Sequence, residues 1–415
     1  MGSGVSRKIF FINRFYRPDH SATSQILTDL TRHLEPAGSE IHVITSRLLY
    51  DDSERLLPAY ERLDGVHVHR VWSSRFGRGK LLGRAVDYLS FYATSLLTML
   101  RSVGRGDILV AKTDPPLISV FAALACKLKG ASLINWLQDL FPEVAAELGI
   151  RGLSSGPLYR LARGLRNWSL RTARANVVLG EGMARRIENE IAQAEKTRVI
   201  PNWVIGSDMR PIAREENPLL EEWGLGERFV IGYSGNLGRA HDYKTILEAA
   251  ICLQDEPSIL FLFIGGGAGY QLLREEMEKR SLPNVLFKPY QPADRLAYSL
   301  SLADVHLISL EPRLEGLIVP SKLYGILAVG RPMIFLGDRQ GEIGGLIEDH
   351  ELGCVAAMGE PNALIQSIES LSRDHESCGR MGGHARRLFE QRYAPDISYR
   401  SWRELLVERA NTRMN

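Results

Sequence analysis

Short apolar runs alternate along this chain with longer stretches in which apolar residues recur every three or four positions. Apolar runs of four to eight residues are typical of buried strands, whereas the longer spacing is typical of amphipathic helices. Because the two alternate, we predict an α/β chain whose parallel sheets are covered by helices on both faces. The predicted strands are residues 8–13, 40–46, 66–72, 107–112, 132–137, 176–179, 198–200, 229–233, 259–264, 285–287, 305–310, 333–336 and 353–356.

The length of the chain and one polar stretch indicate two domains. With 415 residues the chain is longer than a single domain, because domains generally contain about 50–250 residues. Residues 204–227 are rich in proline, glutamate and other polar residues, which is typical of a linker. We therefore expect one α/β domain on each side of this segment.

Charge and cysteine content exclude several classes of protein. The 51 Lys and Arg nearly balance the 49 Asp and Glu, so the chain lacks the basic excess of a nucleic-acid-binding protein. Cys126, Cys252, Cys354 and Cys378 show neither metal-ligand spacing nor the density of a disulfide-rich domain. The first residues lead into a predicted strand without the apolar core of a signal peptide. We expect reduced thiols, no nucleic-acid partner and a cytoplasmic location.

One turn, Pro320-Ser321-Lys322, combines the features of an anion site. Proline cannot lie in the middle of a helix and Ser321 is a favourable N-cap, so a helix is expected to begin here and to continue through Leu323. Free N–H groups and the positive end of the helix dipole would lie beside the ammonium of Lys322, an arrangement that favours phosphate. Gly330 is expected to end the helix. The alternative is that this segment is only one helix–strand unit of a parallel sheet.

A second, glycine-rich segment at residues 232–239 favours the phosphate interpretation. It joins an apolar run to an amphipathic stretch, so its glycines are expected at a strand-to-helix junction. Glycine there lets the backbone approach a pyrophosphate, whose charge neighbouring cations would hold. The glycine triplet at 265–267 follows the next predicted strand and allows a similar approach. The candidate ligands from these segments are Gly235, Asn236, Gly238, Arg239, Lys244, Gly265 and Gly266.

These segments, taken in order with several others, resemble a known family of enzymes. They are QDLFPE at 138–143, IPNW at 200–203, GYSGNLGRA at 232–240, FIGGGAG at 263–269, LADVHLISL at 302–310 and EGLIVPSKLYGILAVGRP at 315–332. The set resembles the bacterial nucleotide-sugar-dependent glycosyltransferases of family four, a retaining group. It is most similar to the branch that assembles capsular, O-antigen and exopolysaccharide repeat units, and the resemblance covers nearly the whole chain.

The resemblance implies two Rossmann-like domains that face each other across a cleft, the GT-B architecture. The expected parts are an acceptor-binding domain at 1–205, a nucleotide-sugar-binding domain at 206–390, and a helix at 391–415 that crosses back to the first domain. The implied reaction moves a sugar from a nucleoside diphosphate to a polysaccharide or lipid-linked glycan and retains its configuration. No metal or other cofactor is expected, since helix dipoles and nearby cations would stabilise the departing diphosphate.

The resemblance also assigns roles to individual residues. Asp139 would orient or deprotonate the acceptor hydroxyl, with capping of a helix at 143–148 as its alternative role. Glu315 matches the first Glu of the family's pair, which lies against the donor sugar, whereas the second Glu, which holds the ribose, aligns with Gly325. Tyr290 lies where the family binds the nucleotide base. The residues expected in catalysis are Asp139, Glu315, Arg239 and Lys322. The acceptor-side candidates are Ser21, Ala22 and Thr23, with helix capping as the alternative for this loop.

Two basic stretches favour a peripheral membrane contact. Residues 70–105 carry seven Arg and Lys with aromatic residues interleaved, against Asp87 alone. The uncharged run at 88–100 is shorter than the roughly twenty residues that span a bilayer, so it is either an interfacial segment or a buried helix beside a solvated basic loop. Residues 151–186 carry eight arginines against Glu181 alone and resemble a basic amphipathic helix, which would suit a lipid-linked pyrophosphate acceptor, with a solvated face as the alternative.

Two other functions fit the same segments. An epimerase that acts on nucleotide sugars would share the fold and the donor site. A catalytically silent subunit that only binds the donor would share them as well. An epimerase would convert the donor without an acceptor. A silent subunit would bind the donor without transferring its sugar or hydrolysing it.

Overall fold

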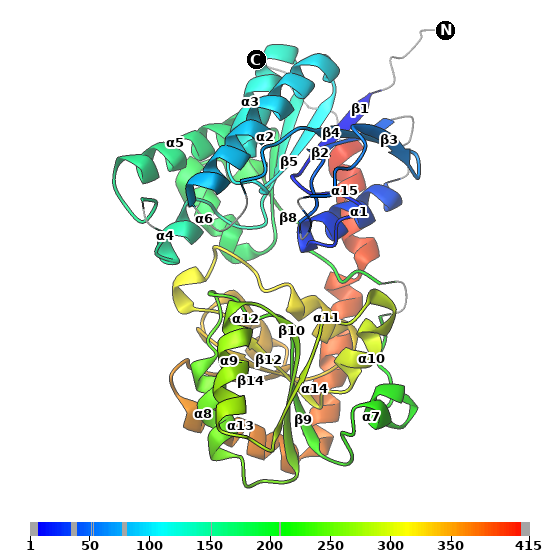
Figure 1. Cartoon of the computed structure of the whole chain (residues 1–415), viewed down its shortest axis with the longest axis vertical. Helices are drawn as coiled ribbons and strands as arrows, with labels where there is room; N and C mark the ends of the chain where they lie inside the picture. Colours follow the sequence, from blue (N-terminus) through cyan, green and yellow to red (C-terminus); the bar gives the residue numbers. More distant parts are fainter. Residues whose placement is uncertain are drawn as a thin grey trace. The chain divides into compact units, whose positions relative to one another are not determined.

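The computed structural model describes residues 7–34, 40–50, 52, 54–76, 81–150, 152–206 and 209–407. Residues 207–208 of the expected linker and 408–415 of the expected last segment lie outside this part. The chain divides into two compact units, Met1–Pro201 with Tyr399–Asn415, and Asn202–Ser398. Each unit is built around one sheet of mainly parallel strands covered by helices (Figure 1), which confirms the predicted pair of Rossmann-like α/β folds.

The sheet of the first unit has the strand order β3-β4-β2-β1-β5-β6-β7-β8. Its strands pair in parallel except β3 with β4. β1 is central, and its Ile9 lies between Ile41 of β2 and Ile108 of β5. The strands are β1 Lys8–Ile12, β2 Glu40–Ser46, β3 Tyr60–Leu63, β4 Val66–Val71, β5 Ile108–Lys112, β6 Ser132–Trp136, β7 Ala175–Val178 and β8 Thr197–Val199.

Alternate residues of these strands point to two helical layers. On one face, Phe10 packs with Phe91 of α2 and Ala122 of α3 in one core. On the other face, Trp136 packs against Trp402 of α15, with ring centroids 4.7 Å apart, and α15 lies beside α1 (Figure 1). The helices are α1 Ala22–His33, α2 Leu81–Ser102, α3 Ile118–Lys129, α4 Glu143–Glu147, α5 Pro157–Thr172, α6 Glu181–Ile191 and α15 Pro395–Val407.

The sheet of the second unit is parallel throughout, in the order β11-β10-β9-β12-β13-β14. Apolar side chains on both of its faces are buried, so its strands read as nearly continuous apolar runs. Ile231 packs on one face with α8, α9 and α13, whereas Val230 packs on the other beside α7. The strands are β9 Phe229–Asn236, β10 Ile259–Gly266, β11 Val285–Lys288, β12 Val305–Ser309, β13 Met333–Leu336 and β14 Gly353–Ala356. The helices are α7 Pro218–Glu222, α8 Lys244–Cys252, α9 Ala268–Lys279, α10 Leu296–Ser301, α11 Lys322–Ala328, α12 Glu342–Asp349, α13 Pro361–Arg373 and α14 His375–Leu388.

The structure corrects the interpretation of the two basic stretches. Residues 151–186 are not one helix, because β7 separates α5 from α6. Arg70, at the start of the other stretch, is buried and forms an ion pair with Glu61 on β3. Arg78 and Lys80 of the stretch 70–105, and Arg151 of the stretch 151–186, lie outside the described residues. The uncharged run at 88–100 forms part of α2.

Candidate functional site

The second unit contains a topological switch point between β9 and β12. β10 and β11 lie on one side of β9, and β12, β13 and β14 lie on the other. Ligands of open parallel sheets bind outside the carboxyl ends of the strands at such a point. β12 pairs with β9 only at Val305–Ile231 and His306–Gly232, whereas β9 continues to Asn236 beside β10. The two strands therefore part at their carboxyl ends.

Lys322, the first residue of α11, lies at this switch point. Its Nζ is buried, lies 3.4 Å from the centroid of the Tyr233 ring and has no hydrogen-bond partner among the described residues. A Cβ atom placed on Gly235 of β9 would lie 3.9 Å from Lys322 Cε. Burial lowers the pKa of Lys322 well below its ordinary value. A buried ammonium without an acceptor is unfavourable, and an anion bound beside it would remove that penalty.

Two histidines interact electrostatically with Lys322, and neither offers it a negative charge. His241 Nδ1 lies 2.5 Å from the Ser309 carbonyl oxygen, and burial, with the charge of Lys322, lowers the pKa of His241 to about 3. Burial is also the main cause that lowers the pKa of His306 to about 4. Both imidazoles are therefore neutral near pH 7, so neither offsets the positive charge that Lys322 carries when it is protonated.

Two of these neighbours were missed by the sequence analysis. Tyr233 occupies an inward position of a buried strand, so the sequence gives it the same pattern as any core aromatic residue. His241 lies two residues after the glycine-rich segment 232–239. Its closeness to a candidate phosphate loop could have indicated that it belongs to the site.

The glycines predicted to approach a pyrophosphate lie in close contact with the protein's own backbone. Gly235 and Asn236 belong to β9 and lie opposite Gly265 and Gly266 of β10, so the predicted loop is largely strand. A Cβ atom at Gly265, whose φ is +138°, would lie 2.3 Å from the Gly235 carbonyl oxygen. One at Gly267 would lie 2.7 Å from the Leu237 carbonyl oxygen. Glycine is required because the two strand ends meet without room for side chains.

Several of the N–H groups that begin the nearby helices already have acceptors. The Asp242 carboxylate accepts from the N–H of Lys244 at 2.8 Å at the start of α8. The Leu237 carbonyl accepts from Gly269 at 2.8 Å at the start of α9. In α11, Ser321 occupies the N-cap but makes no side-chain cap bond, and the N–H of Leu323 bonds to the Pro320 carbonyl at 3.2 Å. Free N–H groups were expected only at the start of α11, where the N–H of Leu323 proves to be bonded, whereas Lys322 Nζ has no partner among the described residues.

The other predicted donor-side residues lie around the ends of β9 and β10. Arg239 and Lys244 are exposed, as is Asn236, whereas Gly238 is half-buried. Tyr290 follows β11 and is 59 % exposed, and its ring carbon lies 3.2 Å from the position of a Cβ atom at Gly266. An exposed aromatic ring over a glycine provides a flat surface on which a base can stack.

The structure places the two positions of the expected glutamate pair in different surroundings. The Glu315 carboxylate lies against Gly341 and accepts from the N–H of Glu342 at 3.3 Å, at the start of α12. Gly325 is buried in α11, where a Cβ atom would lie 3.0 Å from Leu300 Cδ1. A side chain at 325 would therefore require Leu300 to move, and this chain has glycine, without a carboxylate, at that position.

In the first unit, Asp139 follows β6 and is largely buried. Its Oδ1 has no hydrogen-bond partner among the described residues. Burial and the charge of Asp114 raise the pKa of Asp139 to about 6, although a hydrogen bond with Thr113 acts in the opposite direction. The N-cap of α4 is Pro142 and no side chain caps that helix, so the capping alternative for Asp139 is wrong. A carboxyl group with this pKa is suited to exchange a proton near neutral pH.

The acceptor-side loop lies at the switch point of the first unit, between β1 and β5. Ser21 occupies the N-cap of α1 without a cap bond, and Ala22 is exposed. The Thr23 hydroxyl donates to Asp114 at 3.5 Å. Its carbonyl accepts at 2.9 Å from Lys112, a buried lysine that the sequence analysis missed and whose Nζ lies 4.1 Å from the centroid of the Trp136 ring.

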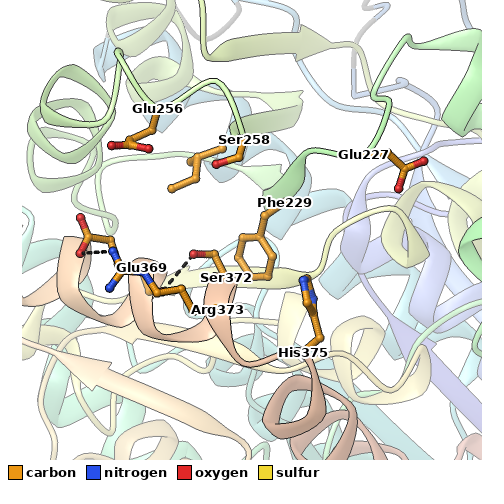
Figure 2. Close-up of a pocket in the computed structure, with 9 residues that line it drawn as sticks. Glu227, Phe229, Glu256, Ser258, Glu369, Ser372, Arg373 and His375 are labelled. Atoms are coloured by element: carbon orange, nitrogen blue, oxygen red, sulfur yellow. Dashed lines mark hydrogen bonds and ion pairs between the residues drawn. The ribbon is translucent and has the colours of Figure 1, made fainter.

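A pocket of about 220 Å³ opens elsewhere in the second unit, at the amino-terminal ends of β9 and β10 (Figure 2). Phe229 and His375 line it together with Glu256 and Glu369. It lies at the opposite edge of the sheet from Lys322, because the switch point is at the carboxyl ends of the strands. None of the predicted site residues lines it. In the described ranges, no group of three or more His, Cys, Asp or Glu is arranged to hold a metal ion.

Comparison with known proteins identifies the family. The family model "Glycosyl transferase 4-like domain" matches residues 22–203, and the model "Glycosyl transferases group 1" matches residues 218–388. WbjE of Pseudomonas aeruginosa, assigned as a glycosyltransferase, is 28 % identical over 78 % of this chain and 80 % of its own length. WcaI of Escherichia coli K12, assigned as a glycosyl transferase of colanic acid biosynthesis, is 26 % identical over 88 % of this chain and 90 % of its own.

Solved structures share the fold. Sucrose-phosphate synthase from Thermosynechococcus elongatus superposes with a TM-score of 0.75 at 15 % identity, over 96 % of this chain and 98 % of that one. HepE from Anabaena, solved in complex with UDP, gives 0.67 at 16 % identity, over 96 % and 99 %. WaaG, a glycosyltransferase of lipopolysaccharide biosynthesis, gives 0.68 at 13 % identity, over 97 % and 100 %. With both family models matched in succession over most of its length, this chain belongs to the glycosyltransferases of the GT-B type.

Proposed function

We propose that this glycosyltransferase moves a sugar from a nucleoside diphosphate sugar to a growing polysaccharide or lipid-linked glycan, with retention of configuration and without a bound metal. The observation that carries the proposal is Lys322, whose buried Nζ lies at the switch point of the second unit and has no hydrogen-bond partner in the part of the chain that the structure describes. A diphosphate supplies the missing negative charge. As the sugar departs, charge grows on the diphosphate, and an ammonium already in place stabilises that charge.

The residues around Lys322 supply the other parts of a donor site in this proposal. Arg239 and Lys244, exposed at the end of β9 and the start of α8, hold the outer phosphate oxygens. Tyr290 stacks on the base. Glu315 takes the sugar, as the resemblance implies. The solved complexes of HepE with UDP, and with UDP-glucose, support a nucleotide-sugar donor for this fold.

In the first unit, Asp139 is the proposed proton acceptor for the attacking hydroxyl group. Its raised pKa, about 6, lets it take up a proton during the reaction and release it afterwards. Ser21, Ala22 and Thr23 form the acceptor side of the same unit. The assignment of WcaI to colanic acid biosynthesis supports a cell-surface polysaccharide as the product class. The four free cysteines support a reducing, cytoplasmic location.

A ligand panel followed by a product assay tests this function. UDP, ADP, GDP, dTDP and their sugar derivatives are added singly, and the expected result is a raised melting temperature with one base, because ligands of the native state stabilise it. The matching donor is then incubated with and without a membrane or glycan acceptor extract. Transfer, or slow donor hydrolysis without acceptor, is expected. An epimerised donor, or binding without either reaction, would contradict the proposal.

A further inference from the structure

Arg14, in the loop that follows β1, is a buried arginine whose side chain has no hydrogen-bond acceptor. It is 9 % exposed, and no hydrogen bond or ion pair connects its guanidinium to any residue in the described part of the chain. The two other arginines buried in these ranges both have carboxylate partners. Arg70 forms an ion pair with Glu61. Arg166 forms one with Glu143. Because a buried cation without an acceptor is unfavourable, the exception at Arg14 requires an explanation.

Two aromatic rings hold the guanidinium of Arg14 in place. Its Cζ lies 5.2 Å from the centroid of the Phe15 ring and 5.0 Å from the centroid of the Tyr88 ring on α2. Contacts between a cation and an aromatic face recover a part of the hydration that a buried cation loses. They leave the five N–H donors of the guanidinium without an acceptor, since an aromatic face offers no oxygen. The rings therefore fix the position of the cation and leave its donors available.

Arg14 lies at the switch point of the first unit, beside the proposed acceptor loop. β1 is followed by Arg14 at its carboxyl end, between β2 and β5, where open parallel sheets bind their ligands. The N–H of Arg14 donates to the Asp114 carbonyl at 2.7 Å. The Asp114 carboxylate accepts from the Thr23 hydroxyl at 3.5 Å, and its charge contributes to the raised pKa of Asp139. Arg14 and the proposed proton acceptor Asp139 therefore both adjoin Asp114.

We propose that Arg14 binds an anionic group, a phosphate or a carboxylate, on the acceptor glycan. This inference rests on the function proposed above and adds a requirement for charge on the acceptor. A guanidinium presents its N–H donors in a planar fork that matches two oxygens of either group. The bound group supplies the acceptors that the protein lacks around Arg14. Because Arg14 and Asp139 both adjoin Asp114, the anionic group lies on or next to the sugar residue that carries the attacking hydroxyl.

Thermal unfolding of the full chain with simple anions tests this binding without an acceptor. The probes are sodium phosphate and sodium glucuronate, each compared with sodium chloride at equal ionic strength. Every protein carries Lys322→Met, so that the lysine of the donor site does not contribute. The melting temperature is expected to rise by about 2–4 °C with at least one probe at about ten times its Kd. Adding Arg14→Met is expected to abolish this rise.

The difference between the two proteins reports the site. Phosphate also stabilises proteins by its exclusion from their surface, but that effect is common to both proteins and cancels in the comparison. The probe that gives the larger difference identifies the group: phosphate indicates a phosphate-bearing acceptor, and glucuronate indicates an acidic sugar. Absence of a rise with either probe would overturn the proposal, as would equal rises with and without Arg14.

Matched variants separate binding from packing. Methionine keeps a long apolar side chain against both rings, so the Arg14→Met protein without ligand is expected to melt at the same temperature as its parent or higher. Arg14→Lys restores the charge without the planar fork and is expected to keep part of the anion-dependent rise. Arg274→Met is the control, because Arg274 lies 5.9 Å over the Phe287 ring in the second unit and pairs with Glu278. It should keep the full rise.

Initial rates with two forms of the acceptor then test the specificity. One form carries its anionic group, and the other has been dephosphorylated or carboxyl-reduced. The kcat/KM of the otherwise wild-type enzyme is expected to be at least about tenfold higher for the anionic form, mainly through KM, because the neutral form leaves a buried charge unpaired. Arg14→Met should lose this preference, and an unchanged preference would overturn the proposal. If the wild type transfers no sugar, the proposed function fails, whereas the melting temperatures still decide whether Arg14 binds an anion.

Discussion

Replacing Lys322 by methionine is predicted to lower turnover about a hundredfold or more. Methionine keeps a long apolar side chain against the Tyr233 ring and removes only the ammonium. One charge-assisted hydrogen bond contributes about 1.5–3 kcal/mol, which is about a 10- to 150-fold change in binding. Loss of one preorganised donor to a transition state usually costs about 100- to 1,000-fold in turnover. The effect on turnover is therefore expected to exceed the effect on donor affinity.

The same substitution is predicted to leave the nucleotide-free protein equally stable or more stable. Burial holds the pKa of Lys322 far below 10.5 in the folded state, so the unfolded state binds this proton more readily. Wild-type stability should therefore fall as the pH is lowered below about 10.4, by up to about 1.4 kcal/mol per pH unit, until the folded-state pKa is reached. The Lys322→Met variant should lack this slope.

Initial rates of sugar transfer or donor hydrolysis, and thermal unfolding between about pH 7 and 10, measure both effects. Lys279→Met is the control, because Lys279 is an exposed lysine on α9 that pairs with Glu276; it should behave like wild type. Wild-type turnover in a folded Lys322→Met protein would refute the assignment. A variant that is less stable than wild type and keeps the same pH slope would refute the electrostatic reasoning.

Three further predictions concern metal, the strand ends and an edge of the first sheet. Transfer should continue in excess chelator, and a loss of activity that magnesium or manganese restores would contradict this. Gly265→Ala should lower the free energy of unfolding in urea by more than about 1 kcal/mol, because its Cβ would overlap the Gly235 carbonyl, whereas Gly345→Ala, with open space around it, should not. Burial lowers the pKa of His42, to about 4, and that of His69. Stability should therefore decline as the pH falls below about 6.5, and a His42→Phe variant with an unchanged decline would contradict this.

Most of the fold could be predicted from the sequence, because buried parallel strands consist of nearly continuous runs of apolar residues. β13 and β14 match their predicted limits for this reason. β3 was missed because Tyr60–Leu63 is an edge strand with polar and exposed residues, so its pattern resembles a loop. The end of β9 was missed because Gly235 and Asn236 are typical of turns. These two residues are part of a strand only because they pair with β10. That pairing depends on the tertiary fold and cannot be predicted from the neighbouring residues.

The candidate site was predicted in part for a similar reason. Lys322 was recognisable because a cation beside a helix start is unfavourable unless an anion is present. The ring of Tyr233 beneath it could not be predicted, since contacts between β9 and α11 depend on the tertiary fold. The same applies to the basic helix α5, because Arg163 and Arg166 pair with Glu190 and Glu143, which lie outside residues 151–186.

Calorimetric titration of a nucleoside diphosphate tests the central claim most directly. Whichever of UDP, ADP, GDP and dTDP binds wild type most tightly is titrated at about pH 8 in two buffers that differ in ionisation enthalpy, which reports the protons taken up on binding. Wild type should take up protons on binding, because the diphosphate raises the lowered pKa of Lys322. Lys322→Met should bind about 10- to 150-fold more weakly and take up fewer protons, while Lys279→Met matches wild type. Equal affinity and equal proton uptake in wild type and Lys322→Met would contradict the claim that Lys322 is the diphosphate ligand.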